Sequence, residues 1–434
     1  MTTEIAILNK SAIALAADSA VTITGPNGQS KIFNTVNKLF ALSKYHPVGI
    51  MIFDNAQLMG MPWETIIKMY RSKLGQIRFP TVQEYAEHFL KFLNDNPDLF
   101  PESVQAESYT ALLNFYFSQI KEAAMQACDQ YIHQNGSIEE AKVLEILVGQ
   151  IHSSFMKIDG LNELTNLPYE FATTIANRYK EQIQGVREDV FGKVSLPKQS
   201  DDELHKIATS LVTKEYFPER GNSGIVIAGF GEAEPFPSLR SYILQGVFAN
   251  KVKFRPFKDS TISFRRHAII TSFAQDEMVH IFMQGVDPSY EYFIETTLHE
   301  LFEKHWISPL SEAGTGTADD KAEMIEALRK VQAAAFAELK EKCTKHKRKH
   351  YINSVLDAVA ALPKDELAAM AESLINLTVL KRKVSMTLET VGGAIDVAVI
   401  SKGDGLIWIK RKHYFDQQLN AQFLANYYRK DEEA

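Results

Sequence analysis

Thr2 carries the most reactive combination of groups in the sequence once Met1 has been removed. A threonine at the start of a chain holds a hydroxyl nucleophile and a free α-amine on one residue, so the nucleophile and its base arrive together. The unperturbed pKa of an α-amine lies near ~7.7–8.0, which leaves a useful neutral fraction near pH 7. A small residue in second place normally permits removal of the initiator methionine. The sequence therefore predicts a nucleophile that requires no histidine.

The segments that follow Thr2 have to position it, and they read as strands. Short apolar runs at 4–8 and 12–17 are separated by a turn at 9–11, and further short runs and breaks continue to Phe53. Residues 12–17 are apolar on both faces, which predicts a sheet covered on both sides. A helical period then runs from Ala56 to about Leu74. The chain thus begins as a meander of strands that ends in a helix.

Helical and strand segments alternate along the rest of the chain. Helices are predicted at 82–93, 106–135 and 138–155, strands between 223 and 273, helices at 290–306 and 319–355, and a closing hairpin at 394–409. This order suits an α+β sandwich of two stacked sheets with helices outside. We expect five segments: an N-terminal half of the sandwich at 1–75, a helical insertion at 76–215, strands of the second sheet at 216–275, a helical block at 276–385, and closing strands with a C-terminal tail at 386–434.

Several short stretches occur in an order known from one family: Thr2-Thr3, Leu15-Ala16-Ala17-Asp18-Ser19, Thr22, 35–40, and 48–51 followed by a helix. They resemble proteasome β subunits and their bacterial two-ring relatives, which are N-terminal nucleophile (Ntn) hydrolases. The resemblance is best over residues 2–74, and it is weaker at 224–246 and 392–410. It implies a four-layer αββα sandwich of two antiparallel sheets, enlarged here by the helical insertions.

Position by position, the resemblance assigns Thr2 as the nucleophile, Asp18 as a buried carboxylate and Lys38 as the catalytic lysine. The chemistry is consistent with these assignments, because a nearby cation lowers the energy of alkoxide character on a hydroxyl and a carboxylate keeps that lysine charged and oriented. Asp18 ends one predicted strand and Lys38 begins another. Antiparallel pairing can therefore bring both residues to the strand that carries Thr2.

Three parts of the sequence depart from the family pattern. Phe53 stands where the family has a glycine whose backbone N–H helps to form the oxyanion hole, and its side chain is expected to crowd the groove or redirect the main chain. The family's later aspartate and serine fall on 388–391, where Glu389 or Thr390 is the candidate substitute, with Glu389 counted among the catalytic residues. Its Gly-Ser-Gly segment falls on 274–276, where Asp276 stands in for the serine. A structural role for Glu389, Thr390 and Asp276 stays open.

The overall composition argues against several other classes of protein. The formal net charge is -7, so the chain has no global basic field for nucleic acid or an anionic membrane. The chain contains only two cysteines, which suits a reducing compartment. No window approaches the ~18 consecutive apolar residues of a membrane span, and no signal peptide is recognisable. We expect a cytoplasmic protein.

Two further motifs are weak, and no cofactor or metal is expected. The strand at 225–229 resembles the start of a dinucleotide fingerprint, but Glu234-Pro235 follows where the third glycine and a helix are needed. Cys343, His346 and His350 are spaced as on one helix face, but the surrounding lysines and arginine oppose a metal ion, which leaves a solvated or partner-docking basic face.

Two functions follow from the sequence. The first is a threonine peptidase that uses Thr2 on a peptide or protein substrate, with an ATP-dependent unfoldase as a partner and a homo-oligomer as the expected assembly. The second is a catalytically inactive Ntn scaffold or regulatory protein, in which the helical insertions form the interaction surface. Phe53 and the missing serine favour this second function.

Overall fold

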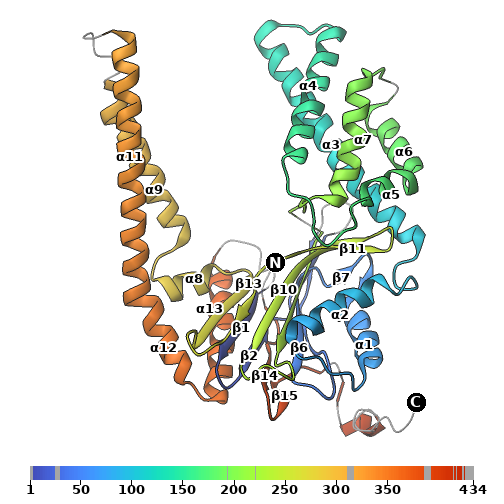
Figure 1. Ribbon diagram of the computed structural model, residues 1–434, viewed down its shortest axis with the longest axis vertical. Helices are drawn as coiled ribbons and strands as arrows, with labels where there is room; N and C mark the ends of the chain where they lie inside the picture. The colour runs from blue at the N-terminus through green and yellow to red at the C-terminus, as the bar shows by residue number, and fades with distance from the viewer. Residues whose placement is uncertain are drawn as a thin grey trace. The chain divides into compact units, whose positions relative to one another are not determined.

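The computed structural model describes residues 3–24, 30–192, 194–219, 221–309, 317–385, 392–413, 415, 416, 418–422 and 425. The chain divides into two compact units. The first combines residues up to Leu39 with residues from Thr261 onward, and the second contains Phe40–Ser260. Antiparallel sheets and helices occur in both units (Figure 1), so the predicted α+β class is confirmed.

The first unit is built on a five-stranded sheet with the order β13-β1-β2-β14-β15. Neighbouring strands pair antiparallel. The predicted turn at 9–11 is confirmed, and the Asn9 side chain accepts hydrogen bonds from the N–H groups of Ser11 and Ala12. The predicted closing hairpin is also confirmed. The strands of this sheet are β1 (Thr3–Asn9), β2 (Ile13–Ala17), β13 (Ala268–Ala274), β14 (Asp396–Ser401) and β15 (Gly405–Lys410).

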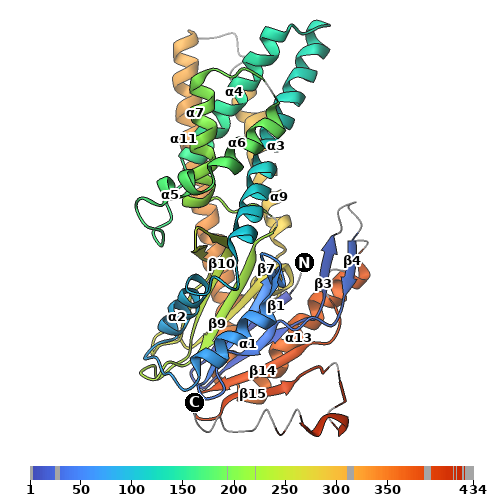
Figure 2. The same ribbon diagram turned by 90° about the vertical axis from the view of Figure 1, so that its right-hand side faces the viewer.

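Helix α13 (Lys364–Val384) covers one face of this sheet and contacts β1, β2 and β14 (Figure 2). Alternate strand residues such as Ile5 and Ala16 share a buried cluster with Leu374 of the helix. This alternation follows from the two-residue period of a strand, and the small alanines of β2 let the helix approach closely. All residues of β2 are buried, as its apolar sequence predicts. Helices α8 (Glu277–Gln284) and α12 (Asn353–Ala361) complete this layer.

A long helical hairpin also belongs to the first unit, and its two arms lie side by side (Figure 1). Lys347 pairs with Glu291 and Lys340 pairs with Glu295, so the arms run antiparallel. The helices predicted at 290–306 and 319–355 are found here, although each contains a π-helical turn. The elements are α9 (Pro288–Phe302) with the π-turn η1 (Glu303–Ile307), and α11 (Ala318–Lys347) with the π-turn η2 (Arg348–Ile352).

The remaining elements of the first unit are short. Strands β3 (Val21–Thr24) and β4 (Ser30–Phe33) pair antiparallel as a separate ribbon (Figure 2). The 3-10 helix η3 (Gln418–Asn420) lies near the end of the described chain.

The second unit contains a sheet with the order β11-β10-β9-β6-β5, beside which the short β12 pairs with β10. Helices α1 (Trp63–Leu74) and α2 (Val82–Asn94) share a buried core with β6, β9 and β10. The strands are β5 (Leu39–Ala41), β6 (Val48–Asp54), β9 (Ser223–Gly229), β10 (Ser238–Phe248), β11 (Lys251–Pro256) and β12 (Ser260–Thr261).

The helix predicted from Ala56 begins seven residues later than expected, at Trp63. The residues before it form a two-strand hairpin, β7 (Gln57–Leu58) and β8 (Met61–Pro62). Met59 and Gly60 have positive φ angles of 51° and 82° at the turn, which a helix does not accommodate. The expected helical start was therefore wrong.

A helical block lies between the two strand regions of the second unit. Tyr109 and Tyr179 stack at a ring-centroid distance of 4.6 Å in its core, and the Tyr109 hydroxyl donates to the Ala208 carbonyl at 3.0 Å. The helices predicted at 82–93, 106–135 and 138–155 are confirmed, with ends that differ by a few residues. The helices of the block are α3 (Glu102–Asn135), α4 (Glu140–Asp159), α5 (Phe171–Arg178), α6 (Lys180–Phe191) and α7 (Lys198–Thr213).

Candidate active site

The register of β1 and β2 places Asp18 beside the first described residue of the chain. Glu4 pairs with Ala17, the last residue of β2, so Asp18, which follows it, lies opposite Thr3. The Asp18 N–H donates to the Thr3 carbonyl at 3.2 Å, and the Thr3 N–H donates to Asp18 Oδ1 at 3.1 Å. The carboxylate is thereby fixed to the backbone one residue after Thr2.

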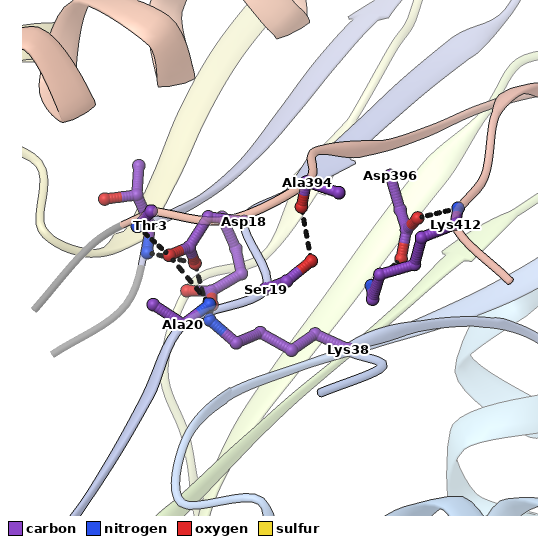
Figure 3. Close-up of polar contacts among 10 residues, drawn as sticks. Thr3, Asp18, Ser19, Ala20, Lys38, Ala394, Asp396 and Lys412 are labelled. Atoms are coloured by element: carbon purple, nitrogen blue, oxygen red, sulfur yellow. Dashed lines mark hydrogen bonds and ion pairs between the residues drawn. The ribbon is translucent and has the colours of Figure 1, made fainter. Parts of the chain in front are cut away.

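The Asp18 carboxylate is fully buried and accepts hydrogen bonds at both oxygens. Oδ1 receives the Thr3 N–H and the Lys38 ammonium, whose Nζ lies 2.5 Å away. Oδ2 receives the N–H groups of Ala20 at 3.3 Å and Gly392 at 3.0 Å. These donors on both oxygens hold the carboxylate in one orientation (Figure 3).

Lys38 is held between two carboxylates rather than one. It precedes β5 in the chain, and only 2% of its surface is exposed. Its Nζ lies 2.5 Å from Asp18 Oδ1 and 3.3 Å from Glu4 Oε1, and Glu4 is fully buried. An ammonium has three N–H donors, so two carboxylates in different directions restrict where the third donor can point.

Glu4 is the residue that the sequence analysis missed. It lies in β1, in which every residue is buried. A charged side chain within an otherwise buried strand needs a partner, because unpaired buried charge is strongly unfavourable. The position of Glu4 inside the apolar run at 4–8 was the available signal, and it pointed to a lysine or arginine nearby.

The segment after Val391 closes the site from the far end of the chain. The Ser19 N–H donates to the Gly392 carbonyl at 3.2 Å, and the Ser19 hydroxyl donates to the Ala394 carbonyl. Gly393 has a φ of 77°, and a Cβ at this position would lie 2.6 Å from the Asn34 carbonyl oxygen. Only glycine fits this close approach of two backbones without displacing one of them.

A second ion pair lies near the group (Figure 3). Asp396 is 2% exposed, and its carboxylate accepts hydrogen bonds from the Lys412 N–H, at 2.8 Å, and from the Lys412 ammonium. The pair ties the chain after β15 to the start of β14. It stabilises the sheet next to Asp18, and the cation that Asp396 contacts is Lys412 rather than Lys38.

The Thr3 hydroxyl is buried, and its Oγ1 has no hydrogen-bond partner within the described part of the chain. Thr3 also pairs with Ala274, which has a φ of 60°. A left-handed conformation at a residue other than glycine stores strain, and such strain gathers at functional sites. Ala274 is the first residue of the 274–276 segment that was expected, from the resemblance alone, to align with Gly-Ser-Gly.

The remaining predicted site residues lie outside the described residues, in the second unit, or in contacts of their own. Thr2, Glu389 and Thr390 lie outside the described residues. Phe53 belongs to the second unit, where its ring packs over Gly224 and lies 5.8 Å from the ring of Phe257. The Asp276 carboxylate lies 3.3 Å from His280.

The weaker motifs show no ligand site in the ranges that the structure covers. The strand at 223–229 ends in a turn in which the Glu234 side chain accepts the Gly231 N–H at 2.8 Å, so no helix opens there. His346 and His350 lie 4.4 Å apart by ring centroids, but no group of three His, Cys, Asp or Glu side chains among the described residues is placed to hold a metal. None of the described helices is long and apolar enough to cross a membrane.

The assembled group therefore holds a lysine and an aspartate side chain in fixed positions next to Thr3. It contains no histidine. Comparison with known proteins adds no family to this geometry, because no protein-family model and no curated protein matches the chain.

Proposed function

We propose that this protein is an Ntn hydrolase that cleaves peptide bonds with Thr2 as its nucleophile. The observation that carries the proposal is the buried chain of contacts from the Thr3 N–H to Asp18 and from Asp18 to Lys38. These contacts begin at Thr3, the residue that follows the predicted nucleophile in the sequence. The proposal includes the four-layer αββα sandwich, in which the two antiparallel sheets stack.

The reaction begins when removal of Met1 frees the α-amine of Thr2. This amine, directly or through a water molecule, accepts the hydroxyl proton while Oγ1 attacks the amide carbonyl carbon. The Lys38 ammonium stabilises the negative charge that develops, and Asp18 keeps the ammonium in place. The tetrahedral intermediate collapses as the proton passes to the leaving amine, so the C–N bond breaks and an ester to Thr2 remains.

Hydrolysis of the ester completes the cycle. Water attacks the ester carbonyl and gives one proton to the α-amine, which returns it to the Thr2 oxygen as the carboxylic acid leaves. The resemblance assigns the backbone N–H at position 53 to the oxyanion hole. A peptide or protein substrate, an ATP-dependent unfoldase partner and a homo-oligomeric assembly belong to the same proposal.

An inactive scaffold is the second candidate, and Glu4 is the observation that favours it. Glu4 lies 3.3 Å from Lys38 and adds a second acceptor for the ammonium. An ammonium committed to two carboxylates is less available to a developing alkoxide. The two candidates differ in whether Thr2 reacts.

The test combines intact mass with a peptide electrophile that requires a vicinal amine and hydroxyl. Protein purified from cells is expected to lack Met1 and to gain one adduct on Thr2. Thr2→Ala is the matched control, because it still permits removal of Met1 but supplies no hydroxyl. Lys38→Met is expected to slow adduct formation by at least about 100-fold, in line with the loss of one electrostatic stabiliser. A mature chain that retains Met1, or a processed chain that forms no adduct, leaves the scaffold as the conclusion.

A further inference from the structure

The second unit contains a cavity of about 940 Å³. Its lining includes no residue of the Asp18–Lys38 group or of the Asp396–Lys412 pair. It lies among α3, the β7–β8 hairpin, residues 216–219, 221 and 222, and β10. Its volume is at the upper end of the range for ligand pockets, roughly 300–1,000 Å³. The lining residues are Asn55, Gln57, Met59, Gly60, Ser108, Ala111, Leu112, Phe115, Gln119, Tyr216, Phe217, Pro218, Glu219, Gly221, Asn222, Gln245 and Phe248.

The β7–β8 wall of the cavity is anchored to the neighbouring sheet. The Ser223 hydroxyl donates to the Gln57 carbonyl at 2.8 Å. The Val247 N–H lies 2.9 Å from the Met59 sulfur, which accepts it. These contacts, made by the protein's own residues, fix the turn at 59–60 against β9 and β10.

The wall at 216–217 is anchored by a buried lysine. Lys253 is fully buried, and its ammonium donates to the carbonyls of Leu211, at 2.6 Å, and Tyr216. Its Nζ also lies 4.6 Å from the ring centroid of Phe217, within the range of a cation–π contact. Because this wall is already ordered by the protein's own contacts, less conformational entropy of the protein is lost when a ligand binds.

Two oxygen atoms of this cavity lack donors. Asn222 Oδ1 and Gln245 Oε1 are buried and have no hydrogen-bond partner among the residues that the structure describes. The Asn222 amide nitrogen donates to the Pro218 carbonyl, which leaves its oxygen as the unmatched atom. A buried acceptor without a donor is unfavourable by about 1–3 kcal/mol, so a ligand that brings N–H donors relieves this cost.

The rest of the lining defines the chemistry of the ligand. Further carboxamides come from Asn55, Gln57 and Gln119, and Phe115 is an aromatic side chain with 49% of its surface exposed. Glu219 is the only charged side chain among the described lining residues. The described lining residues thus offer carboxamides, aromatic rings and one carboxylate, a set that suits neutral or basic groups with N–H donors.

We propose that this cavity binds an extended peptide segment with an apolar side chain. A peptide supplies repeated N–H donors for Asn222 and Gln245 and repeated carbonyls for the amide nitrogens of the other carboxamides. Its apolar side chain packs against Met59, Phe115 and Phe248. The choice of a peptide rests on the proposed function, and a neutral sugar is the competing ligand that the experiment separates.

The experiment measures binding of a fluorescent, end-blocked, uncharged pentapeptide with a central leucine to the full chain carrying Thr2→Ala, which prevents turnover. Gln245→Leu and Phe115→Ala are each expected to weaken binding about tenfold, equivalent to about 1.4 kcal/mol. An analogue of the peptide with methylated backbone nitrogens, which lacks the N–H donors, is expected to bind more weakly by at least the same factor. Tyr169→Ala removes an exposed aromatic side chain outside the cavity and is expected to leave binding unchanged.

The outcomes separate this proposal from the proposed hydrolase. Unchanged binding in both Gln245→Leu and Phe115→Ala overturns the cavity proposal, as does equal binding of the methylated analogue or displacement by a linear neutral pentasaccharide. Because Phe115 is half exposed, its variant tests the site even where Gln245→Leu fails to fold. Cavity-dependent binding in a chain whose wild-type form yields no Thr2 adduct supports the cavity and removes the hydrolase. Adduct formation on Thr2 without cavity-dependent binding supports the hydrolase and overturns the cavity proposal.

Discussion

The Lys38 ammonium forms ion pairs with both Glu4 and Asp18, and the relative strength of these two pairs gives the sharpest quantitative prediction. Nζ lies 2.5 Å from Asp18 Oδ1 and 3.3 Å from Glu4 Oε1. Coulomb attraction varies inversely with distance, so the Glu4 attraction is about three quarters of the Asp18 attraction, from the ratio of 2.5 to 3.3. Asp18 also holds three backbone N–H groups, which lose their acceptor when it is replaced.

Three single variants and two double variants measure this relative strength. Lys38→Met and Asp18→Asn each break a buried ion pair and are expected to lower the free energy of unfolding by about 3–5 kcal/mol. Glu4→Gln keeps the shape and one neutral acceptor, so its expected loss is smaller, about 1–3 kcal/mol. The double variants of Lys38→Met with Asp18→Asn and with Glu4→Gln are expected to lose less than the sum of their single variants.

The assay is urea unfolding followed by circular dichroism and tryptophan fluorescence, with each coupling energy taken from a double-mutant cycle. Asp396→Asn serves as the control, because Asp396 is equally buried and has its own lysine, Lys412. Its coupling with Lys38→Met is expected to be the smallest of the three. A coupling between Glu4 and Lys38 that is indistinguishable from zero, or larger than that of Asp18, would refute the relative strength inferred from the distances.

Three further substitutions test other parts of the structure. Ser19→Ala removes a hydrogen bond to a backbone carbonyl and is expected to lower the free energy of unfolding by about 0.5–1.5 kcal/mol in urea titrations. Gly393→Ala brings a Cβ against the Asn34 carbonyl and forces a left-handed φ, so a loss above about 1 kcal/mol is expected, whereas Gly403→Ala points into open space and is expected to change stability little. Burial lowers the pKa of Lys253 well below 10.5, so the unfolded chain binds the extra proton in the window between the lowered pKa and 10.5. Lys253 therefore makes the free energy of unfolding increase with pH across that window. Urea titrations at several pH values measure this increase, and an equal increase in a Lys253→Met chain contradicts the account.

Much of the first unit could be predicted from local sequence. The turn at 9–11 and the closing hairpin have turn residues between apolar runs, and those signals are local. The sequence predicted that antiparallel pairing could bring Asp18 and Lys38 together. The structure places their side chains in contact, but β5, which follows Lys38, belongs to a different sheet from β1 and β2. Their catalytic roles, and that of Thr2, stay predictions.

Other features depend on contacts that no local pattern encodes. Helical periodicity continued through residues 57–62, but the backbone at Met59 and Gly60 turns there and β7–β8 forms instead. Glu4 was overlooked because its significance depends on Lys38, 34 residues further along the chain. The cavity beside α3 combines residues from four separate stretches, so only the folded chain reveals it.

The hydrogen bond from Gly392 to Asp18 has a consequence for biosynthesis. The ribosome makes the N-terminal residues first, yet one donor to the Asp18 carboxylate comes from residue 392, and the β2 strand pairs with β14 beyond it. A nascent or prematurely terminated polypeptide that stops before this point lacks both. The full set of donors to Asp18 therefore forms only after residue 392 has been synthesised, and the proposed chemistry of Thr2 would begin only after that point.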